Sequence, residues 1–251
     1  AHYTYIVSKL TFLEKETVDW QHIIDNMYYA YDDSRHIFLQ QDGYLDKEQI
    51  LVKDLDPSNL PLNQKWSWDR ILRSCYIKQA DVLQGIYFFE ARFDTETIRR
   101  NFEFYEPRTV HESSLSPCVH SILAARIGEF DKAYEMYLRT ARLDLDNYNN
   151  DTEDGLHITS MAGTWLSIVQ GFGGMQLKGD KLSFYPMLPK EWDSYSFRIN
   201  FRSNTIEVKV GKDEIIFSNL NGDDLNVEVY GETIQLKSLQ STKFVKRSVM
   251  A

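Results

Sequence analysis

The spacing of apolar residues changes near residue 172, and this change limits the folds available to the 251-residue chain. Before that point, apolar residues recur every three or four positions, which is typical of helices that bury one face. After it they alternate with polar residues, which is typical of strands. We therefore predict an α plus β multidomain protein, with helices over residues 1–172 and a small antiparallel β-sandwich domain over residues 173–251.

Capping residues predict several helix boundaries. Thr17 is a candidate N-cap for a helix that reaches Tyr31, and Asp94 or Thr95 for a helix that ends near Phe104. Pro117 suits the first turn of a helix that Gly128 would stop. Helical spacing also covers residues 77–89, 131–143 and 156–169.

Five segments of the C-terminal part alternate polar and apolar residues, and the tract Asn221–Asp224 between two of them predicts a hairpin turn. The least regular part of the helical region is Gln40 to Lys65, where Pro57 and Pro61 interrupt helical spacing. A loop of this length often covers an active site, although a plain surface loop is the alternative. The predicted strands are 181–185, 196–201, 205–210, 214–218 and 225–230.

Charge and composition exclude several classes of function. The chain carries 28 Lys and Arg against 37 Asp and Glu, a net charge of −9, which disfavours binding to nucleic acid or anionic membranes. It has no apolar run of the roughly 20 residues that cross a bilayer, and its first residues lack signal-peptide character. With only Cys75 and Cys118, a disulfide framework is not expected, and a cytoplasmic location fits best. Aromatic residues make up 14%, which suits sugar stacking as well as an ordinary core.

No motif indicates a cofactor or a metal ion. Gly171–Gly174 lacks the spacing and the preceding strand of a phosphate-binding glycine loop. The two cysteines are far apart in sequence, and no Cys and His residues have zinc-binding spacing. We therefore expect neither a cofactor nor a metal.

Three segments place polar groups in apolar surroundings. In the first, Lys78 and Gln79 precede a strongly apolar stretch. A lysine near a helix start is unfavourable for the helix dipole, so another purpose is plausible, and a cation beside an amide suits sugar hydroxyls. A solvated first helical turn is the alternative interpretation.

The second segment, Val110–Pro117, contains Ser113, Ser114 and Ser116 just before a predicted helix. Hydroxyls in this position are ordinary helix caps, but together with backbone N–H groups they also bind phosphate. In the third, Asp154–Trp165, His157, Ser160 and Thr164 share one helix face. A core histidine is the alternative there. Together the two segments suggest a site for inorganic phosphate.

The same segments carry a resemblance to a known family. Residues 77–82, 105–116 and 154–165 resemble motifs of the maltose phosphorylase family, the inverting α-glucoside phosphorylases of glycoside hydrolase family 65. This family also includes trehalose, kojibiose and nigerose phosphorylases. The tracts 60–69 and 143–148 most resemble the members that act on maltose.

The resemblance implies a fold and a set of site residues. The family combines an N-terminal β-sandwich, a linker, an α/α barrel of six helix pairs and a small C-terminal β domain. Residues 1–172 would then be later barrel helices and residues 173–251 the C-terminal domain. The resemblance implies that Lys78 and Gln79 bind the transferred glucose. It places Ser113, Ser114, His157 and Ser160 where the family binds phosphate.

The implied reaction is phosphorolysis of maltose with inversion, giving β-glucose 1-phosphate and glucose. Phosphate is a substrate here and needs positioning more than a general base. The resemblance places the general acid, a Glu, before Ala1, so no catalytic residue is assigned in this chain. Glu112 is not given that role, although in a hydrolytic relative a carboxylate so placed could activate water. The full-length enzyme is expected to be a cytoplasmic homodimer.

Two other interpretations stay open. The enzyme could act on another α-glucoside such as trehalose, kojibiose, nigerose or trehalose 6-phosphate, with a loop such as Gln40–Lys65 reading the acceptor sugar. Alternatively, the 251 residues could be a non-catalytic sugar-binding or structural module. If the chain folds alone, we expect a large exposed apolar face where further barrel helices would pack.

Overall fold

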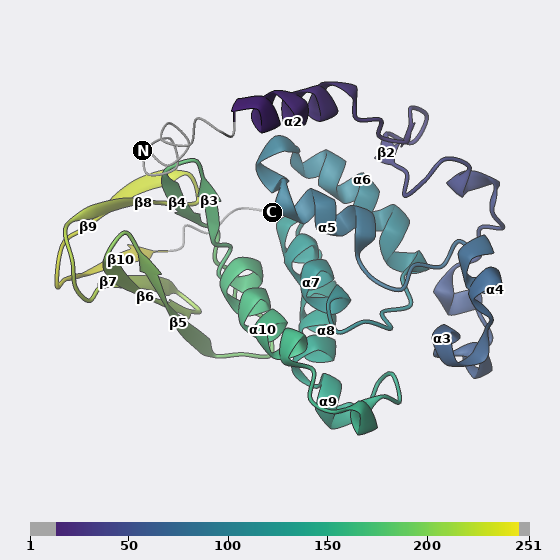
Figure 1. Cartoon of the computed structure of the whole chain (residues 1–251). Helices are drawn as coiled ribbons and strands as arrows, with labels where there is room; N and C mark the ends of the chain where they lie inside the picture. The colour runs from purple at the N-terminus through teal and green to yellow at the C-terminus, as the bar shows by residue number, and fades with distance from the viewer. Residues whose placement is uncertain (1–13, 246–251) are drawn as a thin grey trace. The chain divides into compact units, whose positions relative to one another are not determined.

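The computed structural model describes residues 14–245 (Figure 1). The first ten residues, on which the expectation of no signal peptide rests, lie outside this range. The chain divides into two compact units, residues 1–42 and 43–251. Along residues 14–245, no helix combines the length and the apolarity needed to cross a bilayer.

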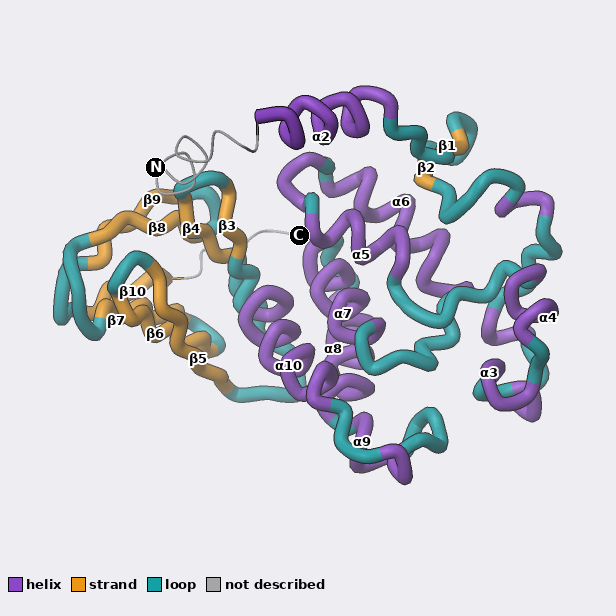
Figure 2. Tube along the Cα trace, in the orientation of Figure 1, coloured by secondary structure: helices purple, strands orange, loops and turns teal. Residues whose placement is uncertain are grey.

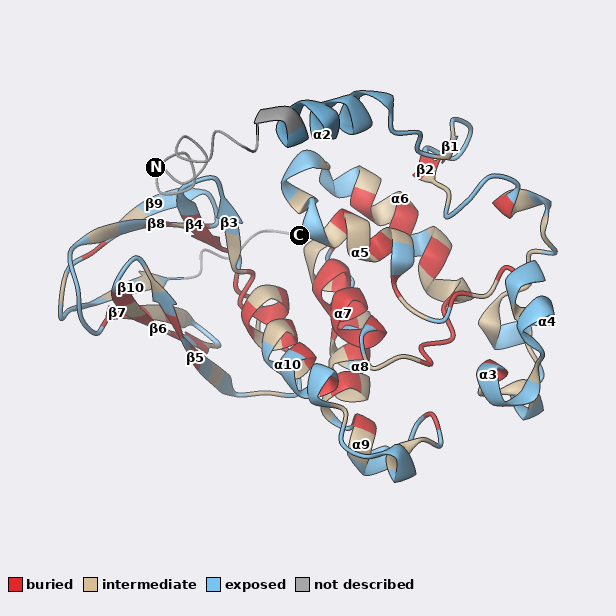
Figure 3. Cartoon of the chain, in the orientation of Figure 1, coloured by how far each residue is buried: buried red, intermediate tan, exposed pale blue. Residues whose placement is uncertain are grey.

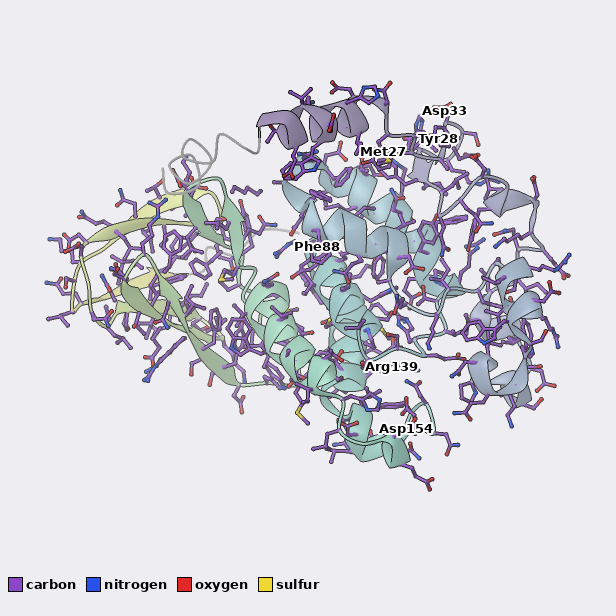
Figure 4. The ribbon with its side chains drawn as sticks, in the orientation of Figure 1. Met27, Tyr28, Asp33, Phe88, Arg139 and Asp154 are labelled. Atoms are coloured by element: carbon purple, nitrogen blue, oxygen red, sulfur yellow. The ribbon has the colours of Figure 1, made fainter. Side chains whose placement is uncertain are left out.

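The first unit contains one helix and one short β-hairpin. Helix α2 (Glu14–Asn26) begins before Thr17, so the predicted N-cap at Thr17 is wrong, and it ends before Tyr31. Strands β1 (Tyr31–Asp32) and β2 (Ile37–Phe38) then pair in antiparallel fashion. The hydroxyl of Tyr28, labelled in Figure 4, donates to Asp42 at 2.8 Å.

The second unit begins with short 3₁₀ turns and helices, and Figure 2 shows the helices in purple joined by teal loops. The irregular stretch predicted at Gln40–Lys65 contains three 3₁₀ turns and ends in a four-residue helix. The helices are α3 (Leu62–Lys65), α4 (Trp68–Arg73), α5 (Asp81–Phe88), α6 (Thr95–Tyr105), α7 (Ser116–Arg126), α8 (Phe130–Ala141), α9 (Leu143–Asp146) and α10 (Ile158–Leu166), followed by a π-helical turn (Ser167–Phe172). The 3₁₀ turns are Tyr44–Asp46, Val52–Asp54, Pro57–Asn59, Glu90–Arg92, Glu106–Arg108 and Thr152–Asp154.

Local signals predicted the ends of α6 and α7 correctly. The Asp94 carboxylate accepts the Thr97 N–H at 2.7 Å, which satisfies a donor that the helix itself leaves unpaired. Pro117 lies in the first turn of α7, and Gly128, with a φ of +83°, follows its end. The helix predicted from residue 77 is wrong at its start, because α5 begins only at Asp81.

Helix α7 forms the centre of the helical part (Figure 3). Its first nine residues are all buried. A helix surrounded in this way needs small or apolar residues on every side. It packs against α5, α6, α8, α10 and the π-helical turn.

Two four-stranded sheets follow the helices. Their orders are β10-β7-β6-β5 and β3-β4-β8-β9. All pairings are antiparallel except β4 with β8, which is parallel, so the antiparallel sandwich prediction is right for most strands only. The strands are β3 (Gln176–Lys178), β4 (Lys181–Phe184), β5 (Ser194–Phe201), β6 (Asn204–Gly211), β7 (Glu214–Asn219), β8 (Leu225–Val229), β9 (Glu232–Leu236) and β10 (Ser241–Val245).

The two sheets share one apolar core. Phe184 of β4 and Val229 of β8 are fully buried together with Ile206 of β6 and Phe217 of β7. The predicted hairpin at Asn221–Asp224 is wrong, because it joins β7 of one sheet to β8 of the other. A polar turn sequence is equally suited to both connections, so turn chemistry alone could not separate them.

The sheets also pack on the helices of the same unit. Trp192, from the tract before β5, makes edge-on contacts with Tyr134 and Tyr137 of α8 and with Phe172, at ring-centroid distances of 5.3–6.0 Å. Arg126, at the end of α7, pairs with Glu90 at 2.5 Å and donates to the Met175 carbonyl at 3.1 Å. These contacts make the helical and sheet parts one packed body.

Helix α10 has an exposed apolar face. Ile158, Met161 and Trp165 recur at helical spacing, and their exposed fractions are 74%, 49% and 48%. Leu156, just before the helix, is 74% exposed. The exposed apolar surface expected from the sequence is therefore present, while the six-pair barrel stays a prediction.

Candidate functional site

A short parallel bridge brings two of the three polar segments together. Ile77 pairs with Thr109: the Ile77 N–H donates to the Arg108 carbonyl at 3.0 Å, and the Val110 N–H donates to the Ile77 carbonyl at 2.8 Å. Lys78 and Gln79 follow the bridge in a bend of the chain before α5. Lys78 is exposed and Gln79 is half-buried.

The serine segment adjoins Gln79 directly. Ser113 Oγ donates to Gln79 Oε1 at 3.1 Å, and it also accepts the Leu115 N–H at 3.3 Å. Ser114 Oγ lies 2.6 Å from Thr159 Oγ1, in the first turn of α10. The structure therefore brings together Gln79, Ser113 and Ser114, from two predicted segments, with Thr159 from the third.

The backbone before the serines is held in an unusual conformation. His111 is buried and has a φ of +54°, in the left-handed region that a side chain disfavours. Its ring Nδ1 lies 3.0 Å from Ser116 Oγ, and its carbonyl accepts Arg139 Nη2 at 3.3 Å. Arg139 lies on α8, as Figure 4 shows. These contacts hold the loop in the shape that presents Ser113 and Ser114.

His157 is held by two carboxylates at the start of α10. Its Nδ1 lies 2.5 Å from Asp144, whose other oxygen accepts the His157 N–H at 3.0 Å, and its Nε2 lies 3.5 Å from Asp151. The hydrogen bond to Asp144 raises the pKa of His157 and lowers the pKa of Asp144. The arrangement favours the imidazolium form, while both ring nitrogens face carboxylates.

The structure places Ser160 in the interior. Its hydroxyl donates to the Thr140 carbonyl at 2.7 Å, and the residue is 2% exposed. Thr164 likewise donates back to the Ser160 carbonyl at 2.9 Å. The phosphate contact of Ser160 therefore stays a prediction. Thr159, which the sequence argument missed, presents its hydroxyl to Ser114 instead.

A cavity of about 650 Å³ lies beside these groups, between α5, α7 and α10. Gln79 and Thr159 line it, together with Asp81, Tyr87, Leu115 and Leu166. Burial raises the pKa of Asp81. The volume is in the range of pockets that bind small molecules, and an apolar wall with a few polar groups is typical of such pockets.

Several buried polar atoms on the segments around residues 111, 139 and 149–151 have no hydrogen-bond partner within residues 14–245. They are His111 Nε2, Arg139 Nε, Asn149 Nδ2 and Asp151 Oδ1. Buried polar atoms usually have partners, so unpaired ones are typical of sites that receive a ligand or water. Arg139 Nε and Asn149 Nδ2 are donors and Asp151 Oδ1 is an acceptor, while the role of His111 Nε2 depends on the tautomer of its ring. Within the same residues, no group of three or more metal-ligating side chains is present.

Two family models match the chain. Residues 2–166 match the glycosyl hydrolase family 65 central catalytic domain, and residues 175–236 match the C-terminal domain of that family. The two models together account for most of the chain and cover all three polar segments.

Individual proteins that resemble the chain agree with this family match. Maltose phosphorylase of Bacillus subtilis is 58% identical over 224 residues, which are 89% of this chain and 30% of that protein. Alpha,alpha-trehalose phosphorylase of Thermoanaerobacter brockii is 40% identical over 94% of this chain and 30% of its own length. A solved structure of a human-microbiome protein assigned to kojibiose phosphorylases is 37% identical with a TM-score of 0.86, covering 96% of this chain and 32% of that one. The chain thus spans about a third of the relatives it matches.

Proposed function

Because the chain belongs to glycosyl hydrolase family 65, we propose that the full-length protein containing it phosphorolyses maltose with inversion, giving β-glucose 1-phosphate and glucose. Residues 1–172 would supply later helices of the α/α barrel, and residues 173–251 the C-terminal β domain. The identity of 58% to a maltose phosphorylase favours maltose over other disaccharides.

The observation that carries this proposal is the hydrogen bond of 3.1 Å between Ser113 and Gln79. It joins the segment proposed to bind glucose to the segment proposed to bind phosphate. In an inverting reaction, phosphate attacks the anomeric carbon from the face opposite the leaving oxygen, so the two binding groups must adjoin. Phosphate is already an anionic nucleophile, and hydroxyl donors that position it supply what the reaction needs from this side.

We assign the site residues accordingly. Lys78 and Gln79 bind the glucose that is transferred. Ser113 and Ser114 bind phosphate, together with His157 and Ser160 from the start of α10. The general acid, a Glu, lies upstream of Ala1, so this chain supplies binding groups and not the acid.

The test is an assay of the full-length protein on maltose with and without phosphate. We expect equimolar glucose and glucose 1-phosphate, with the β-configuration of the glucose 1-phosphate identified by nuclear magnetic resonance. Release of glucose without phosphate would contradict the proposal. Calorimetry of the isolated 251 residues with maltose or phosphate should show weak or no binding, because half of the site is absent. Micromolar affinity would contradict that.

The second candidate is phosphorolysis of another α-glucoside. The 40% identity to a trehalose phosphorylase supports this second candidate. A panel of maltose, trehalose, kojibiose, nigerose and trehalose 6-phosphate, assayed under one set of conditions, separates the two. We expect maltose to have the highest kcat/KM.

Removing the serine hydroxyls should weaken phosphate binding. A hydrogen bond to a charged group contributes about 1.5–3 kcal/mol, so Ser113→Ala and Ser114→Ala are each expected to raise the KM for phosphate about tenfold or more. Ser196→Ala, at an exposed position on β5, is the matched control and should leave this KM unchanged. Steady-state kinetics with phosphate varied at saturating disaccharide measure the effect. Unchanged KM in both serine variants would remove them from the phosphate site.

A further inference from the structure

The carboxylate beside the two serines joins their loop to a distant segment. Glu112 is 8% exposed. Its Oε1 accepts the N–H of Leu62, and its Oε2 accepts the N–H of Asn63 at 3.2 Å. These two N–H groups belong to the last part of the irregular stretch 40–65, some fifty positions earlier in the chain. Both carboxylate oxygens are therefore engaged by the backbone of another segment.

A second set of contacts ties the same segment to the turn before α10. Gln64 Nε2 lies 3.3 Å from the Asn149 carbonyl and 3.4 Å from the Asn150 carbonyl. Asn149 in turn accepts Arg139 at 3.4 Å, and Arg139 donates to the His111 carbonyl at 3.3 Å. Residues 61–64, 111–114 and 147–150 thus form one connected network.

This geometry disfavours a catalytic use of Glu112. A carboxylate that activates water needs a free oxygen within reach of that water. Here one oxygen is taken by Leu62 and the other by Asn63, and the side chain is buried. The neighbouring Ser113 instead directs its hydroxyl to Gln79.

We propose that Glu112 is a positioning residue that couples segment 61–64 to the Ser113–Ser114 loop. Glu112 then positions two parts of the site together. One is the loop expected to contact the acceptor sugar, and the other is the pair of hydroxyls proposed to bind phosphate. This inference rests on the proposed function for its kinetic consequences, but the coupling itself is a property of the chain. A change in segment 61–64 should therefore alter phosphate binding, although no residue of that segment contacts Ser113 or Ser114 through a side chain in the network described.

The substitution Glu112→Gln tests the coupling with little change in shape. Glutamine keeps one acceptor oxygen but presents an NH₂ donor to the second backbone N–H, which loses its partner. Gln64→Ala removes the other tie at an exposed position, where loss of folding is not expected. Glu103→Gln, at an exposed position on α6, repeats the charge change as the matched control.

In the full-length protein, Glu112→Gln is expected to raise the KM for phosphate about tenfold, the equivalent of one lost hydrogen bond, with less than about a threefold change in kcat. Gln64→Ala should raise the same KM about threefold to fivefold. The double variant should fall short of the product of the two effects, because both act through segment 61–64. In the reverse direction, the KM for glucose as acceptor should rise in both single variants. Glu103→Gln should match the wild type.

Three kinetic results would overturn the inference in an active enzyme. They are a wild-type phosphate KM in Glu112→Gln, a wild-type phosphate KM in Gln64→Ala, and strictly multiplicative effects in the double variant. An enzyme that phosphorolyses no disaccharide of the panel would contradict the proposed function and leave the coupling to a second measurement.

That second measurement is amide hydrogen exchange followed by mass spectrometry, which needs no activity. Glu112→Gln should increase exchange in peptides covering both 59–66 and 111–116, while Glu103→Gln should increase neither. Increased exchange confined to 111–116 would show that Glu112 stabilises only its own loop, and it would overturn the coupling. Unchanged exchange in both peptides would also overturn it.

Discussion

Replacing Gly174 by alanine is expected to destabilise the protein by about 3 kcal/mol or more. Gly174 lies between the π-helical turn and β3 with a φ of +60°, and an added Cβ would lie 2.3–2.6 Å from backbone atoms of Tyr185. That backbone cannot withdraw freely, because the Tyr185 N–H donates to the Gly174 carbonyl at 3.2 Å. The variant combines backbone strain with a steric clash against β4's end, so both helices and sheets should lose stability.

Gly179 provides the matched control. It has the same φ of +60°, but a Cβ there would meet no atom within 4 Å. Gly179→Ala should therefore show only the cost of the left-handed backbone, about 1–2 kcal/mol. Urea unfolding of the wild type and both variants, followed by circular dichroism, gives the comparison. Equal losses in the two variants would mean that close packing on Tyr185 contributes nothing.

Acid is expected to destabilise the protein through His120. This residue is fully buried on α7, its ring lies 4.5 Å from His111 and 5.6 Å from Phe102 between centroids, and neither of its nitrogens has a hydrogen-bond partner within residues 14–245. Burial, helped by the charge of Lys132, lowers the pKa of His120 from 6.5 to about 3. Burial likewise lowers the pKa of His111.

The lowered pKa of His120 determines whether acid stabilises or destabilises the folded chain. The unfolded chain takes up a proton on this histidine below about pH 6.5, whereas the folded chain does so only near pH 3. The stability that neutral His120 contributes is thus fully present above pH 6.5, and it is lost as the pH falls toward 3. Between pH 7.5 and pH 4.5 the loss from His120 should be about 2–3 kcal/mol.

His120→Leu removes this titration while filling most of the same space. The variant should lose about 2–3 kcal/mol less than the wild type over that interval, as measured by urea unfolding at several pH values. His157→Gln is a control of opposite sign. The pKa of His157 is raised, so its contribution is retained below pH 6.5, and its removal should make the acid loss larger. Identical pH dependence in His120→Leu and the wild type would contradict the assignment.

Elements fixed by neighbouring residues were predictable from the sequence. Asp94 caps α6 through a contact three positions away, and Gly128 follows α7 as a helix stop. Such signals act within one turn of the chain and survive in any fold. The alternating strands were found for the same reason, since each strand shows its own buried face.

The side-chain contacts of the site depend on pairing between distant segments, which the sequence did not predict. Lys78 and Gln79 lie outside α5 because Ile77 bridges to Thr109, some thirty positions away. Helical spacing placed Ser160 on the face of His157, but Thr140 of the neighbouring helix takes its hydroxyl into the core, and Thr159 faces Ser114 instead. No pattern in the neighbouring residues predicts the hydrogen bond between Glu112 and the backbone of Leu62. Motif resemblance identified the segments, while the partners of each side chain depend on which helices pack together.

The aromatic contact around Trp192 has a consequence for how such proteins evolve. Trp192 precedes β5, but its neighbours Tyr134, Tyr137 and Phe172 come from the helical part. A sheet taken from a relative would bring its own side chain to this cluster, so exchanging the sheets alone is expected to disturb the packing of the helical part. Substitutions at these four positions are expected to accumulate in matched sets, which makes the junction a place where two lineages' domains recombine poorly.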